Sequence, residues 1–202
     1  MAPLQCIELG GAQQHHLLNL ARGSINSGLS SGQPLHINAS SLEEELKAHV
    51  GVFVTLTING KLRGCIGNLQ SNKPLGVSVA DNAFGAAFRD PRFGKLESEE
   101  FPVTRIEISV LSRLEHVEAE SRAALLRAIH PGKDGLLLED GKYHATFLPQ
   151  VWEQLAEPEH FLDQLLLKAG LPAGHWSPTL SFKRYHSLSF AESEPAPPQA
   201  AG

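Results

Sequence analysis

The strongest constraint on the fold of this chain is a short hairpin pattern. Residues 52–58 are rich in β-branched side chains and alternate in character, which is typical of a β-strand. Asn59 and Gly60 follow, and this dipeptide strongly favours a tight hairpin turn. Residues 61–67, KLRGCIG, can then return antiparallel. The sequence therefore predicts a hairpin whose second strand carries Cys65 between two glycines.

Two registers of this hairpin place its side chains on opposite faces. With a two-residue turn, Ile58 lies opposite Lys61, and Arg63 and Cys65 share the apolar face of the first strand. With a three-residue loop and a bulge, Ile58 lies opposite Leu62, and Arg63 and Cys65 join the threonine face instead. Matching of apolar side chains across the strands favours the second register.

The remaining elements alternate between helical and strand periods. Helical patterns cover residues 11–22, 42–50, 74–89, 121–129 and 158–169, and strand patterns cover residues 103–111, 180–190 and 135–147, a second hairpin that turns at Asp140-Gly141. This order predicts an α+β protein, mainly antiparallel sheet with flanking helices. Residues 192–202, rich in Glu, Pro, Ala and Gly, are expected to form a disordered tail.

The helix expected at residues 74–89 is apolar almost all round, which is typical of a largely buried helix. Its narrow polar seam consists of Ser78, Asn82, Gly85 and Arg89, with Asp81 beside it. Asp90 and Pro91 end the helix.

The composition is that of a folded globular protein. Of 202 residues, 42% are hydrophobic and 19% are charged, and a chain of this length can bury a core without metals or disulfides. No stretch approaches the ~20 apolar residues of a membrane helix, and the first ten residues lack the pattern of a secretory signal. We therefore expect a cytoplasmic protein with no membrane segment, in which Cys6 and Cys65 remain thiols.

Charge is distributed unevenly along the chain. A net charge of −5 argues against wholesale binding of nucleic acid. Between Lys61 and Lys95, however, six basic residues stand against two acidic ones. This excess indicates either an anion-facing surface or ordinary charged loops around a hairpin.

Cys65 is the candidate nucleophile. Arg63 lies two residues earlier and hence on the same strand face, where its guanidinium would favour the reactive thiolate. A lone strand cysteine can equally be a small buried hydrophobic residue. His144, on the second hairpin, is a candidate base if the fold brings it towards Cys65.

The residues around Cys65 also form a candidate binding site. Gly64 and Gly67 permit the close approach of a ligand or of another backbone, and strand amides beside Arg63 can hold an anion. A second basic turn, DPRF, can fold beside the first. The candidate ligand-binding residues are Arg63, Gly64, Gly67, Arg89, Asp90 and Arg92. Tight packing explains the glycines equally well, and Arg92 can instead pair structurally with Asp90.

Neither metals nor nucleotides have a clear sequence signature. His15 and His16 are consecutive and point about 100° apart on a helix, and Glu157 with His160 is a single weak pair. No phosphate-binding loop and no dinucleotide fingerprint is present, and basic and aromatic residues are not interleaved as in common RNA-binding folds. The sequence predicts no metal site and leaves any cofactor unknown.

Several motifs together resemble the AMMECR-type domain, which includes the A component of the AmmeMemoRadiSam system. They are GVFVTL, NGKLRGCIG, AAFRDPRF, RIEISVLS, GLLLED, ATFLPQVW and LLLKAGL, spread from about residue 17 to residue 190. The resemblance implies a two-lobed α+β domain over residues 1–191 and an association with Memo-type and radical-SAM proteins. It implies no established reaction. Asn68 follows the motif where threonine is more usual.

Three hypotheses for function follow. The preferred one is a non-catalytic or co-catalytic component that docks a partner or an anionic substrate on the face carrying Arg63, Cys65, Arg89 and Arg92. The second is an enzyme that uses Cys65 as nucleophile or redox thiol, with His144 as base. The third is a regulator that binds RNA or another nucleic acid.

Overall fold

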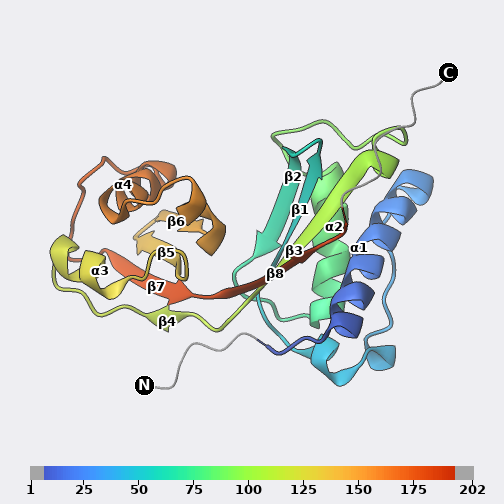
Figure 1. The fold of residues 1–202 in the computed structure, drawn as a ribbon, viewed down its shortest axis with the longest axis horizontal. Coiled ribbons are helices and arrows are strands. Elements are labelled where there is room, and N and C mark those ends of the chain that lie inside the picture. Colours follow the sequence, from blue (N-terminus) through green and yellow to red (C-terminus); the bar gives the residue numbers. More distant parts are fainter. Residues whose placement is uncertain (1–6, 194–202) are drawn as a thin grey trace. The chain divides into compact units, whose positions relative to one another are not determined.

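The chain forms two compact units, each with its own sheet and its own apolar core (Figure 1). The computed structural model describes residues 7–193. The first unit is built from Ile7–Leu111 together with residues 188–193, and the second from Ser112–Ser187. Both sheets are four-stranded and antiparallel. This confirms the predicted α+β class with antiparallel strands and two unequal lobes.

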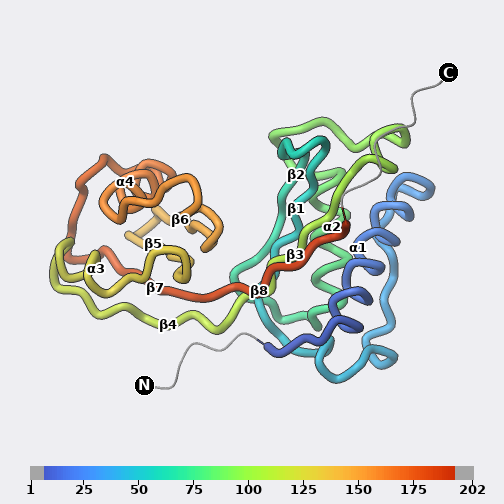
Figure 2. Tube along the Cα trace, in the orientation of Figure 1, coloured from blue at the N-terminus to red at the C-terminus, as the bar shows by residue number. Residues whose placement is uncertain are grey.

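In the first unit, two helices cover one face of a sheet with strand order β2-β1-β3-β8. The strands are β1 (Val52–Ile58), β2 (Lys61–Asn68), β3 (Thr104–Leu111) and β8 (Ser187–Ala191); the helices are α1 (Gly11–Ser31) and α2 (Leu75–Phe88), with 3-10 turns at Ala39–Ser41, Glu44–Lys47 and Phe101–Val103. Figure 2 shows β8 running beside β3 after the chain returns from the second unit.

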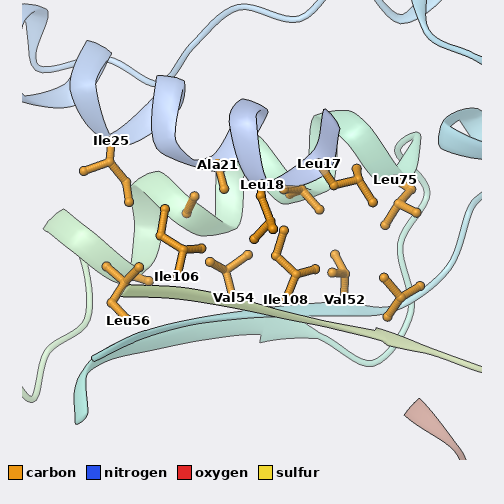
Figure 3. Close-up of a cluster of buried hydrophobic side chains, with 14 of the residues drawn as sticks. Leu17, Leu18, Ala21, Ile25, Val52, Val54, Leu56, Leu75, Ile106 and Ile108 are labelled. Atoms are coloured by element: carbon orange, nitrogen blue, oxygen red, sulfur yellow. The ribbon is translucent and has the colours of Figure 1, made fainter. Parts of the chain in front are cut away.

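The core of the first unit lies between its helices and its sheet. Apolar side chains at alternate strand positions meet one stripe of each helix, as the strand and helix periods require. Figure 3 shows Leu17, Ala21 and Ile25 of α1 above Val52, Val54, Leu56, Ile106 and Ile108 of the strands, all of them fully buried.

The second unit has the strand order β4-β7-β5-β6. Its elements are β4 (Glu115–His116), α3 (Arg122–Ala128), β5 (Gly135–Asp140), β6 (Tyr143–Phe147), a 3-10 turn at Pro149–Glu153, α4 (Pro158–Ala169) and β7 (Ser181–Tyr185). In its core, the rings of Trp152 and Phe161 stack with their centroids 3.7 Å apart. No helix among residues 7–193 is long and apolar enough to cross a membrane.

The first helix is longer than the sequence predicts. Turn-forming residues indicated an end near residue 22, but α1 continues to Ser31 and closes at Gly32, which adopts a left-handed conformation with φ of 71°. Ile25 is fully buried, and a side chain at Gly28 would collide with Phe88 of α2. Packing against α2 therefore overrides the weak local propensity of this segment.

The predicted tail at residues 192–202 starts too early, because Glu192 is held by the fold. The guanidinium of Arg22 binds both oxygens of its carboxylate, and the backbone N–H of Ile106 donates to it at 2.9 Å. The composition indicated disorder here, whereas an ion pair with a residue far back in the sequence orders it. Residues 194–202 of the predicted tail lie outside the described residues.

Candidate functional site

A β-bulge at Arg63 decides the register of the hairpin. Asn59 and Gly60 form a two-residue turn with φ of 51° and 73°, so Ile58 lies opposite Lys61. The register then shifts by one residue, which leaves Arg63 without a partner on β1 and places Cys65 opposite Thr55. The register favoured from the sequence was therefore wrong in giving the turn three residues, and right in placing Cys65 on the threonine face.

Cys65 faces away from the helices of its unit. Its neighbour Gly64 lies against α2, and successive residues of a strand point to opposite faces. The Oγ1 hydroxyl of Thr55 donates to the Cys65 Sγ at 3.4 Å. The thiol thus lies half-buried on the outer face of the sheet, with a hydroxyl donor beside it.

Both glycines of the motif have packing partners. A Cβ atom on Gly64 would collide with the backbone oxygen of Ala86, near the end of α2. A Cβ atom on Gly67 would collide with the ring of Phe53, which lies directly across on β1. The close approach that the sequence indicated is an approach of protein to protein, and the binding role of these glycines stays a prediction.

Asp90 and Arg92 cover the edge of the sheet at Cys65. The order of strands makes β2 an edge strand, whose outward backbone groups need partners. The Asp90 Oδ2 accepts from the Cys65 N–H at 2.9 Å, and the Arg92 Nη2 donates to the Cys65 carbonyl at 3.3 Å. The turn after α2 therefore satisfies the backbone of Cys65 through side chains.

Asp90 is a fully engaged, buried carboxylate. Its side chain is 2% exposed, and it accepts from the Arg92 Nη2 at 2.7 Å, the Arg92 Nε at 3.0 Å and the Arg92 N–H at 3.1 Å. These bonds to Arg92, with that from the Cys65 N–H, hold the pKa of Asp90 well below its ordinary value, although burial opposes them. Asp90 stays ionised and has no lone pair left over to act as a base towards the thiol.

Arg63 ties the hairpin to the loop that precedes β3. Its Nε and Nη2 bind the two oxygens of Glu100 at 2.7 and 2.8 Å, and its Nη1 and Nη2 donate to the carbonyls of Gly94 and Lys95 at 3.0 and 3.1 Å. The paired guanidinium lowers the pKa of Glu100, and the same bond raises the pKa of Arg63. With 15% of its side chain exposed, Arg63 directs its donors into the protein.

The basic residues of this region differ in whether they are ion-paired and in how exposed they are. Arg63, Arg92 and Lys73 form ion pairs with Glu100, Asp90 and Asp81. Arg89, at the end of α2, is exposed and lies 4.7 Å from the centroid of the Phe84 ring. Arg92 is paired and also 54% exposed. The exposed guanidinium groups at this end of α2 are therefore those of Arg89 and Arg92.

His144 belongs to the second unit. It is exposed on β6 and lies across from Glu139 of β5, whereas Cys65 is in the first unit. The pairing of His144 with Cys65 stays a prediction. Throughout residues 7–193, no three or more His, Cys, Asp or Glu side chains are grouped so as to hold a metal ion.

Two contributors to the site were missed by sequence reasoning. Glu100 stands among several glutamates, and nothing local distinguishes the one that binds Arg63. Thr55 could have been named, because the favoured register already placed Cys65 on the threonine face.

Comparisons with known proteins agree with this architecture. The AMMECR1 family model matches residues 18–190 of the chain. A protein of Methanococcoides burtonii is 35% identical over 188 residues, covering 93% of this chain and 92% of its own length. A protein of Methanothermobacter thermautotrophicus is 36% identical over 178 residues, covering 87% and 92%. Among solved structures, an uncharacterised protein from Pyrococcus horikoshii is similar with a TM-score of 0.82 and 33% identity, covering 90% of this chain and 92% of its own.

Proposed function

This chain belongs to the AMMECR1 family, and on that premise we propose that it is a cytoplasmic recognition component, non-catalytic or co-catalytic, that docks an acidic surface of a partner protein. The docking surface is defined by Arg89 and Arg92, and we call it the Arg92 surface. The proposed partners are the Memo-type and radical-SAM proteins that the AMMECR-type resemblance implies.

The observation that carries this proposal is the state of the Arg92 side chain. Asp90 holds the guanidinium from one side through a carboxylate that is 2% exposed, while 54% of the Arg92 side chain stays open to solvent. No described residue accepts a hydrogen bond from its Nη1. A cation fixed in this way loses little conformational entropy when it binds a second carboxylate, and arginine offers the bidentate geometry that carboxylates favour.

The residues around Arg92 also support the docking of a partner protein. The guanidinium groups of Arg63 and Arg92 both lie near the Phe93 ring, with their central carbons 5.9 and 5.5 Å from its centroid. Arg63 anchors this ring by its bonds to the loop behind it. Arginine beside an aromatic ring is a common composition at the energetic centre of protein interfaces.

The test is a binding measurement with the Memo-type and radical-SAM proteins of the same organism, using the full chain. Arg92→Ala and, separately, Arg89→Ala should each weaken binding by roughly tenfold or more, as truncation of an interface arginine does. Arg127→Ala, which removes an exposed arginine from α3, is the matched control and should bind like the wild type. Thermal unfolding of each variant shows whether it is folded.

Two results would contradict the docking proposal. One is that neither candidate partner binds the wild-type chain at low salt. The other is that a partner binds with an affinity that Arg89→Ala and Arg92→Ala leave unchanged, because the contact would then lie on another surface.

A second candidate function, thiol chemistry at Cys65, is favoured by the donors around the sulfur. The Thr55 hydroxyl donates to Sγ, and attraction to Cys65 adds to the bonds with Asp90 in raising the pKa of Arg92. A cation and a hydroxyl donor both favour a thiolate. If Cys65 is reactive, iodoacetamide should alkylate it at neutral pH faster than it alkylates free cysteine, and Thr55→Val should slow that reaction. A rate like that of free cysteine, unchanged in Thr55→Val, removes this candidate and its base His144 together.

A further inference from the structure

A polar pocket lies at the opposite end of the β2–α2 pair from the Arg92 surface. The two elements run antiparallel, so the start of β2 at Gly64 meets the end of α2 at Ala86. The end of β2 at Asn68 meets the first half of α2, and there the pocket opens beside Asn82. It has a volume of about 500 Å³, within the range of roughly 300–1,000 Å³ that small-molecule sites occupy.

The residues that line this pocket are all polar, although aliphatic parts of their side chains also face it. Its eight residues carry amides, hydroxyls, one ammonium and one carboxylate, and none is aliphatic or aromatic. Small-molecule sites are usually lined mainly by apolar groups, because most ligands bring an apolar body. A pocket with this lining suits a ligand that carries many polar groups and only a small apolar framework.

Asn82 provides an amide oxygen that the fold leaves free to accept a hydrogen bond. The residue is 5% exposed, and its Nδ2 donates to the carbonyl of Val52 at 3.0 Å, which fixes the orientation of the amide. No described residue donates to its Oδ1. This oxygen is not among the fully buried unpaired atoms of the described residues, so it is accessible as an acceptor, and Asn82 lines the pocket.

Two serine hydroxyls stand next to this acceptor. The Oγ atoms of Ser71 and Ser78 are 2.8 Å apart, and Ser78 is 3% exposed. Ser71 also accepts from the N–H of Lys73 at 3.0 Å, which fixes the loop between β2 and α2. One hydroxyl donates to the other and the pair also donates to the Lys73 carbonyl, so the two oxygens can still accept a hydrogen bond from a ligand.

The charges of the pocket compensate each other. The Lys73 Nζ lies 2.7 Å from the Asp81 Oδ2, with 58% and 37% of the two side chains exposed. The remaining lining residues are neutral. An anion would meet the Asp81 carboxylate and a cation would meet the Lys73 ammonium, so the balance favours a ligand without net charge.

From these observations we infer that the pocket between the end of β2 and the first half of α2 binds a small, neutral, polyhydroxylated molecule, of the class of monosaccharides and cyclic polyols. Ligand hydroxyls would donate to the Asn82 Oδ1, to Asp81 and to the serine pair, and accept from Lys73. This site is distinct from the Arg92 surface, and substitutions at one do not test the other.

The experiment is ligand-detected saturation-transfer NMR on the full chain with D-glucose, D-ribose and myo-inositol as probes. At least one probe should receive saturation from the wild-type protein, and its signal should level off as the probe concentration rises. Lys73→Met and Ser71→Ala should weaken that binding by roughly tenfold each, as expected for the loss of hydrogen bonds to a ligand. Lys47→Met is the matched control, because it removes another ion-paired lysine, outside the pocket, and it should bind like the wild type.

Lys73→Met and Ser71→Ala should both leave the protein folded, because both side chains are polar and neither lies in the apolar core. The absence of saturable transfer from all three probes would overturn the proposal. So would transfer that Lys73→Met and Ser71→Ala leave unchanged, or displacement of the bound probe by inorganic phosphate, which would indicate an anion site instead.

Discussion

Asp90 joins two segments of the chain through one carboxylate. It accepts from the N–H of Cys65, 25 residues earlier, and pairs with Arg92, two residues later. Since the pKa of Asp90 lies below its ordinary value of 3.8, the folded protein holds this carboxylate ionised where the unfolded chain would protonate it. The resulting stability is present above that ordinary value and is lost as the pH falls below it.

We expect Asp90→Asn to lower the free energy of unfolding by about 2 kcal/mol near neutral pH, since it weakens hydrogen bonds that involve a charged group. The difference from the wild type should shrink as the pH falls below about 4, where the unfolded wild-type chain takes up the proton. Urea unfolding across this pH range measures it. Asp81→Asn, which removes an exposed carboxylate, should cost at most about 1 kcal/mol. Equal losses in the two variants would contradict this account.

At the scale of elements, the hairpin and α2 depend on a contact between backbones. The bulge at Arg63 turns Gly64 towards the helix, and the absence of a side chain there lets the carbonyl of Ala86 approach. The same bulge sends the Arg63 guanidinium to Glu100. One local irregularity therefore positions the helix, the loop before β3 and the outward-facing Cys65.

Gly64→Ala should destabilise the protein by about 1–3 kcal/mol, the usual cost of overpacking a tight contact. The added methyl group would meet a backbone oxygen, which cannot turn aside as a side chain can. Gly94→Ala is the control, because a Cβ there meets no atom within 4 Å, and it should change stability by less than about 0.5 kcal/mol. Chemical denaturation of both variants gives the comparison, and a neutral Gly64→Ala would refute the close-contact explanation.

At the scale of the whole molecule, the second unit is one continuous segment inserted between two strands of the first sheet. Ser112–Ser187 leaves after β3 and returns before β8, and its core is built from its own residues. Both tryptophans, Trp152 and Trp176, belong to this segment. Tryptophan fluorescence therefore reports on the second unit alone, whereas far-ultraviolet circular dichroism reports on both.

We expect the isolated fragment Ser112–Ser187 to fold, because domains of this size commonly bury enough apolar surface to be stable. Its thermal unfolding should be cooperative, and Trp152 should show the near-ultraviolet dichroism of a ring packed against Phe161. A fragment without tertiary dichroism would show that its core needs the first unit.

The sequence by itself determined the strand at residues 52–58, the place of the turn after it and the buried helix α2. These are local patterns and they appear in the structure, although the register favoured from the sequence assigned the turn at Asn59-Gly60 three residues instead of two. Such features follow from backbone geometry and from the periods of strand and helix, which neighbouring residues specify. The resemblance to the AMMECR-type domain likewise rested on short motifs.

Only the tertiary structure decided what the residues of those motifs contact. Four features of the site depend on segments that are distant in the sequence. They are the bulge that turns Cys65 outward, the burial of Asp90, the ion pair of Arg63 with Glu100 and the polar pocket beside Asn82. No local pattern specifies which glutamate an arginine will reach, because that choice depends on how the loops pack. The same packing placed three of these basic residues in ion pairs and left the guanidinium groups of Arg89 and Arg92 exposed.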